Sequence, residues 1–127
     1  MENVDVIALG ELLIDFTYNG TSNQGNPTFE ANPGGAPCNV LSMLAKLGKK
    51  TAFIGKVGSD QFGKLLRQTI SEAGIINDYL FEDENVPTTL AFVHTTLEGD
   101  RSFSFYRTPG ADMMLTADEI SDDMVKH

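Results

Sequence analysis

The sequence predicts an α/β protein in which buried strands alternate with amphipathic helices. The runs at 4–9 and 51–57 are short, β-branched and continuously apolar, which is typical of strands inside a parallel sheet. A helical pattern follows each run, and the two patterns end at Gly48 and Gly74. The order strand, helix, strand, helix, strand therefore indicates a parallel sheet that is covered on both faces.

The first elements fall within residues 1–37. A strand is expected at 4–9, and 12–18 reads as a second extended segment. Residues 19–27 are polar and predict a loop, and 29–31 predict a short strand. The glycine and proline cluster at 33–37 predicts a break before the first helix.

Two helices flank the strand at 51–57. Proline suits the first position of a helix, so the first one is expected to start near Pro37. Its expected apolar face consists of Val40, Met43, Leu44 and Leu47. Asp60 is expected to cap the second helix. The expected apolar face of the second helix consists of Phe62, Leu65, Leu66, Thr69, Ile70 and Ala73. A further strand is expected at 77–81.

The pattern changes after residue 87. Two β-type runs, 88–97 and 101–107, flank Glu98-Gly99-Asp100 and predict a hairpin. Because side chains alternate along a strand, Phe103, Phe105 and Arg107 share one face of it. A hairpin added to an α/β unit suggests a lid.

A last helix is expected over 115–127. Thr116 is expected to cap this helix, and Glu119 completes a capping box.

Composition and charge exclude several classes of function. The 127 residues carry 18 acidic and 9 basic side chains, which argues against nucleic acid and anionic membrane surfaces as partners. The single cysteine, Cys38, allows no intramolecular disulfide, so a cytoplasmic location is expected. Neither a signal peptide nor a membrane span is expected. Cys38, His94 and His127 lack the spacing of metal ligands.

Two glycine-containing segments invite a ligand-binding interpretation. In Pro33-Gly34-Gly35-Ala36-Pro37-Cys38-Asn39 the glycines let the backbone approach a ligand, and Asn39 and the helix start offer donors. The alternative is a plain tight turn into a helix.

Gly58-x4-Gly63-Lys64 nearly matches a phosphate-binding P-loop, but Leu65 stands where Ser or Thr must hold magnesium. We therefore reject the P-loop.

Together these segments resemble the ribokinase/PfkB family of sugar kinases over nearly the whole chain. The resemblance rests on Gly34-Gly35-x-Pro37-x-Asn39 and on Gly55-x-Val57-Gly58-x-Asp60-x-Phe62-Gly63. The opening 10–16 and the runs 90–93 and 103–112 are similar to the fructokinase branch. Leu41 departs from the family, which usually has a small residue there.

The resemblance implies a ribokinase-like, Rossmann-type three-layer sandwich with a β-lid. The chain would be the N-terminal part of a single sugar-kinase domain, with lid segments at about 16–32 and 88–108. The implied sugar-binding residues are Asp15, Gly34, Gly35, Asn39, Phe105 and Arg107. A core position for Phe103 and a surface salt bridge for Arg107 remain open alternatives. Cys38 is expected to be a small buried residue and no nucleophile.

The implied reaction transfers a phosphoryl group from ATP, with Mg²⁺, to a sugar, and fructose is favoured over ribose or 2-keto-3-deoxygluconate. The family's catalytic base lies in a Gly-Ala-Gly-Asp segment that this chain lacks. No catalytic, nucleotide or metal residue is therefore expected here, and the chain alone is expected to be inactive. A homodimer, formed through the lid, is expected. The remaining alternative is a non-catalytic fragment or interaction module.

Overall fold

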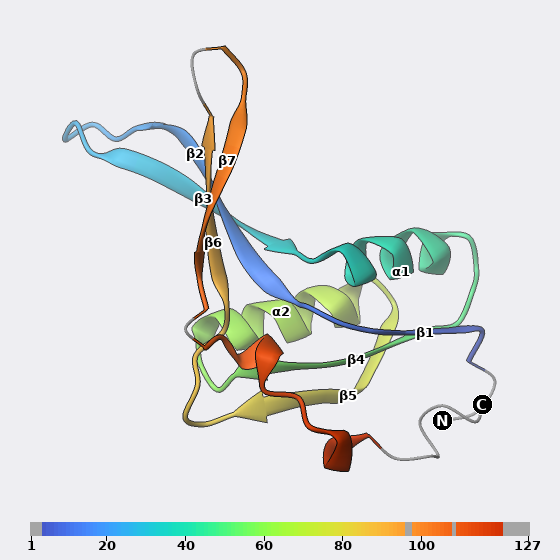
Figure 1. Ribbon diagram of the computed structural model, residues 1–127. Coiled ribbons are helices and arrows are strands. Elements are labelled where there is room, and N and C mark those ends of the chain that lie inside the picture. Colours follow the sequence, from blue (N-terminus) through green and yellow to red (C-terminus); the bar gives the residue numbers. More distant parts are fainter. Residues whose placement is uncertain (1–3, 96–97, 108, 121–127) are drawn as a thin grey trace.

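The computed structural model describes residues 4–95, 98–107 and 109–120, which form two sheets with two α-helices against the first (Figure 1). The first sheet has the order β1-β4-β5, with β1 at Val6–Leu9, β4 at Thr51–Gly58 and β5 at Ile75–Asp83. Both of its strand pairs are parallel, as the sequence predicts.

Helices α1 (Ala36–Lys46) and α2 (Gln61–Glu72) connect these strands and lie on the same face of the sheet (Figure 1). Leu41 of α1 and Leu66 of α2 are fully buried and belong to one hydrophobic cluster with Phe53 of β4. All eight residues of β4 are buried, which agrees with its continuous apolar run. The other face, among the described residues, is contacted by the 3₁₀ turn η1 (Ala111–Met113) and carries no α-helix.

The second sheet has the order β3-β2-β6-β7 (Figure 1). Its strands are β2 (Leu13–Thr21), β3 (Pro27–Gly34), β6 (Leu90–Thr95) and β7 (Arg101–Tyr106). Strands β2 and β6 run parallel, and the other two pairs are antiparallel hairpins. The predicted segments 16–32 and 88–108 fall largely within this sheet, with 96–97 and 108 outside the described residues.

Three strands are longer than the sequence suggested. The predicted loop 19–27 contains the end of β2 and the start of β3, joined by a turn in which Ser22 O accepts from Gly25 N. The strand expected at 77–81 runs over Ile75–Asp83, because it pairs along all of β4. Pairing with a neighbour extends a polar strand beyond its apolar run.

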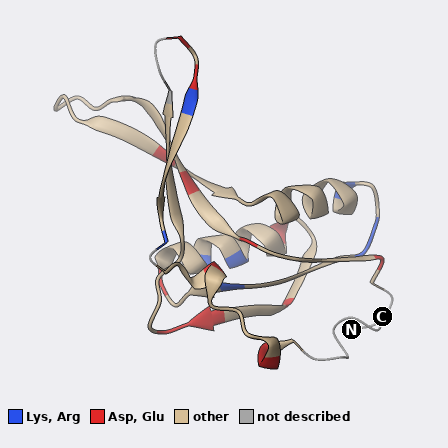
Figure 2. Ribbon diagram, in the orientation of Figure 1, with Lys and Arg blue, Asp and Glu red and all other residues tan. Residues whose placement is uncertain are grey.

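The expected apolar face of α1 is wrong. Val40, Met43 and Leu47 are 57%, 67% and 72% exposed, whereas Cys38 and Leu41 on the opposite side are buried. The helix is apolar on both sides and carries no charged residue before Lys46. In Figure 2 most of α1 is accordingly drawn without blue or red. Periodicity alone therefore did not indicate which side faces the sheet. On α2, Leu66 and Ile70 are buried as expected, but Leu65 is 37% exposed.

The helix expected over 115–127 does not form within the described residues. The capping box of Thr116 and Glu119 is present, but it closes only the 3₁₀ turn η2 (Ala117–Glu119), and Ile120 is extended. Glu119 also forms an ion pair with Lys56 of β4 at 2.8 Å, which fastens the turn to the sheet. Residues 121–127 lie outside the described part.

Asp60 joins the first sheet to the base of the second. Its carboxylate caps α2 by accepting from Gly63 N at 2.7 Å, and it accepts from Thr88 N and Thr88 Oγ1 at 3.0 and 2.8 Å. Burial acts to raise the pKa of Asp60, but the hydrogen bonds from Thr88 and Gly63 outweigh it and lower that pKa. The predicted cap is confirmed.

Candidate functional site

Asp15 lies in a hollow on one face of the second sheet. It is paired with Asn32 of β3 and Ala91 of β6. The hollow has a volume of about 260 Å³. It is lined by Asp15, Thr17, Asn32, Val93, Arg101 and Phe103. This side-chain set combines carboxylate, hydroxyl, amide and guanidinium groups with an aromatic ring, which suits a small polar ligand with an apolar face.

The Asp15 carboxylate packs directly against the backbone of Gly34. A Cβ atom on Gly34 would collide with Asp15 Oδ2. Burial, and then the negative charge of Glu11, raise the pKa of Asp15. Within the described part of the chain no ion pair occupies this half-buried carboxylate, so it can accept hydrogen bonds from a ligand.

Gly35 has a backbone that favours glycine. Its φ is +124°, and a Cβ there would stand 2.5 Å from the carbonyl oxygen of Glu11. The turn therefore brings the start of α1 against the connection between β1 and β2.

Asn39 and Gly34 line a different, smaller cavity of about 50 Å³ between α1 and α2. Cys38 lines it too, and burial raises the pKa of its thiol to about 12, so the thiol stays protonated and is a poor nucleophile. The predicted residues Asp15 and Asn39 thus approach Gly34 from two sides and do not share one cavity.

Phe105 and Arg107 lie together at the end of β7. The Arg107 guanidinium stands 4.5 Å from the centre of the Phe105 ring. It also forms an ion pair at 3.4 Å with Glu11, between side chains that are 29% and 44% exposed. The surface salt bridge that the sequence left open for Arg107 is therefore present. Phe103 is 52% exposed and stacks on Phe105, so it is no core residue.

Sequence reasoning missed four residues of this region: Glu11, Thr17, Asn32 and Arg101. Side chains two positions apart on a strand point to the same face, so Thr17 could have been predicted from Asp15, and Asn32 could have been predicted from Gly34. Glu11 had no such signal, since its pairing with Arg107 spans 96 positions.

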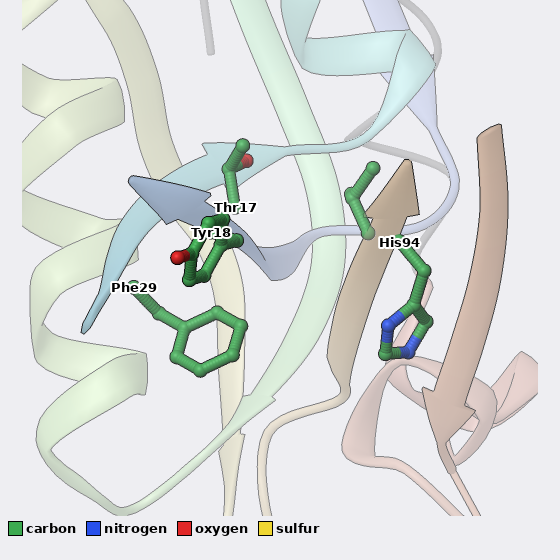
Figure 3. A pocket seen from close by; sticks show the side chains of 5 residues that line it. Thr17, Tyr18, Phe29 and His94 are labelled. Carbon is green, nitrogen blue, oxygen red and sulfur yellow. The ribbon is translucent and has the colours of Figure 1, made fainter. Parts of the chain in front are cut away.

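A second hollow, of about 330 Å³, lies where the β2–β3 and β6–β7 hairpins diverge (Figure 3). Pairing between β2 and β6 stops at Thr17 and Val93, and beyond this point Tyr18, Phe29 and His94 line the gap. The Tyr18 and Phe29 rings meet edge to face at 6.0 Å. His94 Nε2 hydrogen bonds with Ser104 Oγ at 3.1 Å, as befits a polar strand residue.

In 4–95, 98–107 and 109–120, no group of three or more His, Cys, Asp or Glu side chains is placed to hold a metal ion. None of the helices in this part of the chain is long and apolar enough to cross a membrane.

The comparisons with known proteins agree on one family. The model of the pfkB family carbohydrate kinases matches residues 3–127. Among curated relatives, the chain is 46% identical over 127 residues to a probable chloroplastic fructokinase-6 of Arabidopsis thaliana, covering 98% of this chain and 33% of that protein. It is 43% identical to a fructokinase of Solanum tuberosum, covering 95% and 39%. The chain thus spans about a third to two fifths of these relatives.

Solved structures show the same fold. A fructokinase from Xylella fastidiosa is 38% identical with a TM-score of 0.86, covering 94% of this chain and 37% of that one. The same organism's fructokinase with bound ATP is 35% identical with a TM-score of 0.87, covering 98% and 39%. A putative ribokinase II from E. coli, 24% identical, shares the fold with a TM-score of 0.87. The ribokinase-like fold that the sequence predicts is confirmed.

Proposed function

Because this chain belongs to the pfkB family of carbohydrate kinases, we propose that its parent protein phosphorylates a sugar with ATP, and that fructose is the preferred sugar. The observation that carries the proposal is the Asp15 hollow, where hydrogen-bonding groups stand beside an exposed aromatic ring. The choice of fructose is supported by relatives named fructokinase. Use of ATP is supported by the similar fructokinase structure with bound ATP.

The Asp15 hollow supplies what a neutral sugar needs. The Asp15 carboxylate accepts hydrogen bonds from hydroxyl groups, and the Asn32 amide and Thr17 hydroxyl can both donate and accept. The Phe103 ring provides an apolar wall that excludes water from one side of the ligand. Gly34 completes the site by leaving room for the Asp15 carboxylate.

We assign to this chain the sugar-binding half and the lid, the second sheet being the lid. The catalytic base, the nucleotide site and the Mg²⁺ ligands would be supplied by a part of the parent protein beyond these 127 residues. The described residues of this chain include no group of side chains placed to hold a metal ion. The role of this chain is to bind the sugar and orient its hydroxyl group for in-line transfer.

The test is a competition assay on the full-length protein with ATP and four sugars: fructose, ribose, glucose and 2-keto-3-deoxygluconate. We expect fructose to show the highest kcat/KM. Preference for another of the four would overturn the choice of sugar and leave the kinase intact. No phosphorylation of any sugar would favour the non-catalytic alternative.

The lid also supports a proposal about assembly, namely a homodimer formed through the second sheet. Phe16, Tyr18, Phe29, Phe92 and Tyr106 form a chain of ring contacts on the face opposite Asp15. Tyr18 and Tyr106 are 55% and 59% exposed. Exposed aromatic rings are enriched at protein interfaces. Sedimentation of the full-length protein should show a dimer, and Tyr18→Glu with Tyr106→Glu should produce monomers.

We further propose a cytoplasmic location. The single cysteine supports a reducing compartment, and its thiol is buried. Imaging of a tagged full-length protein tests this, and accumulation in an organelle would contradict it.

A further inference from the structure

After β7, one buried hydrogen-bond donor and one buried hydrogen-bond acceptor each lack a hydrogen-bond partner among the described residues. Arg107 Nε is a buried donor and Asp112 Oδ2 is a buried acceptor, and neither has a hydrogen-bond partner among the described residues. Buried polar atoms are nearly always paired, because an unpaired one loses its hydration without compensation. Such a pair on one short segment suggests that the two atoms meet in another state of the protein.

Arg107 and Thr89 pack against Gly110. A Cβ on Gly110 would clash with Thr89 Oγ1 and would stand 3.0 Å from Arg107 Cβ. Thr89 Oγ1 in turn donates to Asp112 Oδ1 at 2.5 Å. Arg107 Cβ and the Thr89 hydroxyl therefore meet at Gly110, and the Thr89 hydroxyl carries the Asp112 carboxylate.

The two side chains are held with unequal firmness. Asp112 accepts from Thr89, and the carbonyl oxygen of Thr89 is itself bound by Ile14 N at 3.1 Å. The turn that carries Asp112 is also fixed, because Ala111 N donates to Pro87 O at 2.8 Å. Arg107 is held by one long contact with Glu11, between partly exposed side chains, and by the face of the exposed Phe105 ring. An exposed pair of this kind contributes little free energy, so the guanidinium is the partner that can turn.

We propose that Asp112 is a positioning residue for the sugar site, and that its Oδ2 accepts the Nε–H of Arg107 when a sugar binds. The inference rests on the proposed function. Once Nε is bound to Asp112, the guanidinium is oriented by a fixed carboxylate, and its terminal N–H groups are presented to sugar hydroxyls. Through Thr89 and Ile14, Asp112 also fixes the strand that carries Asp15. The Asp112 side chain thus positions both Arg107 and the strand that carries Asp15.

A double-mutant cycle on the full-length protein tests the coupling. The variants are Asp112→Asn, Arg107→Gln and the double change, and the readouts are KM for fructose and KM for ATP. Asp112→Asn keeps an acceptor for Thr89 but removes the charge that orients Arg107. We expect it to raise KM for fructose about tenfold in the wild type, but less than about twofold in the Arg107→Gln background. KM for ATP should stay within about twofold throughout.

Equal effects of Asp112→Asn in both backgrounds, or an equal rise in both KM values, would overturn the inference. Asp118→Asn is the matched control, since Asp118 is an exposed acid on the neighbouring turn. If the wild type phosphorylates none of the sugars, the proposed function fails and this inference fails with it. That result is visible before any variant is compared, so the two failures are distinguishable.

Nuclear magnetic resonance of the wild type tests the same pair without a variant that has to fold. The Nε–H signal of Arg107 should move downfield, and its exchange with water should slow, when fructose is added. An unchanged signal at saturating fructose would overturn the proposed pair.

Discussion

The carboxylate of Asp15 occupies the space in which the side chain of any residue other than glycine at position 34 would begin. The two residues face each other across the β2–β3 ladder, where Gly34 is paired with Leu13 and Asp15 with Asn32. The position of the Asp15 carboxylate, which we propose binds the sugar, therefore depends on the absence of a side chain at Gly34 on the neighbouring strand.

Gly34→Ala should damage the sugar site by displacing Asp15. We expect a loss of about 1–3 kcal/mol in the free energy of unfolding from overpacking. Sugar affinity in the full-length protein should fall by about 1.5–3 kcal/mol, as it should for Asp15→Ala. Calorimetry with fructose and with ATP measures both affinities, and that for ATP should be preserved. The double change Asp15→Ala with Gly34→Ala should be more stable than Gly34→Ala alone. Additive losses of stability would contradict the contact.

Asp15→Asn should stabilise the unliganded protein while it weakens sugar binding. Because burial and Glu11 raise the pKa of Asp15 in the folded state, its charge costs stability at every pH above that raised pKa. The cost disappears as the pH falls below the unfolded value of about 4. Thermal unfolding should therefore show a higher Tm for the variant at pH 7 and equal Tm values near pH 3. Asp118→Asn, an exposed control, should change neither. A lower Tm at pH 7 would show that Asp15 stabilises the fold.

The Lys56–Glu119 pair should respond unequally to loss of either partner. Lys56 is 10% exposed and Glu119 is 27% exposed. Glu119→Gln leaves a buried ammonium group without its counter-charge and should cost up to about 3 kcal/mol, whereas Lys56→Met should cost clearly less. Chemical unfolding at pH 7 measures both variants.

The same pair predicts a dependence on pH. The hydrogen bond from Lys56 is the main cause that lowers the pKa of Glu119 in the folded protein. Its stabilisation is therefore present above the unfolded pKa of about 4.3 and is lost as the pH falls through the folded value. The difference between wild type and Glu119→Gln should shrink in acid, and a constant difference would count against the assignment.

The apolar stripe on α1 should make the 127-residue chain associate when it is produced alone. Val40 and Met43 of α1 and Leu47, which directly follows the helix, form a mostly exposed row, and no charged residue precedes Lys46 on the helix. Sedimentation should show dimers or larger species, and lysine at all three positions should yield monomers. Lysine at the exposed polar positions Gln68 and Ser71 of α2 is the matched control. A monomeric wild-type chain would contradict association through α1. Phosphorylation of fructose by the 127-residue chain would contradict the proposal that this chain supplies only the sugar-binding half and the lid.

Most of the fold could be predicted from the sequence, because β4 is a continuous apolar run and because the helical patterns of α1 and α2 are bounded by Gly48, Asp60 and Gly74. The side of α1 that faces the sheet could not be predicted, because both sides of this helix are apolar. The Asp15–Gly34 neighbourhood was suggested by motif alone, and its contact depends on pairing between β2 and β3. The sequence did not predict the contact of Glu11 with Arg107 or that of Asp112 with Thr89. Each contact joins segments that are distant in the chain and that are brought together only by the tertiary structure.

The shared carboxylate of Asp60 has a consequence for how the protein opens. The same group closes the first turn of α2 through Gly63 and holds Thr88 at the foot of β6. Unravelling the helix start therefore frees the strand, and detaching the strand removes the helix cap. The amide hydrogens of Gly63 and Thr88 should thus exchange with solvent in the same rare event, although 25 positions separate them in the chain. We therefore expect the start of α2 and the foot of β6 to open together, so that the second sheet stays attached as long as the first turn of the helix is closed.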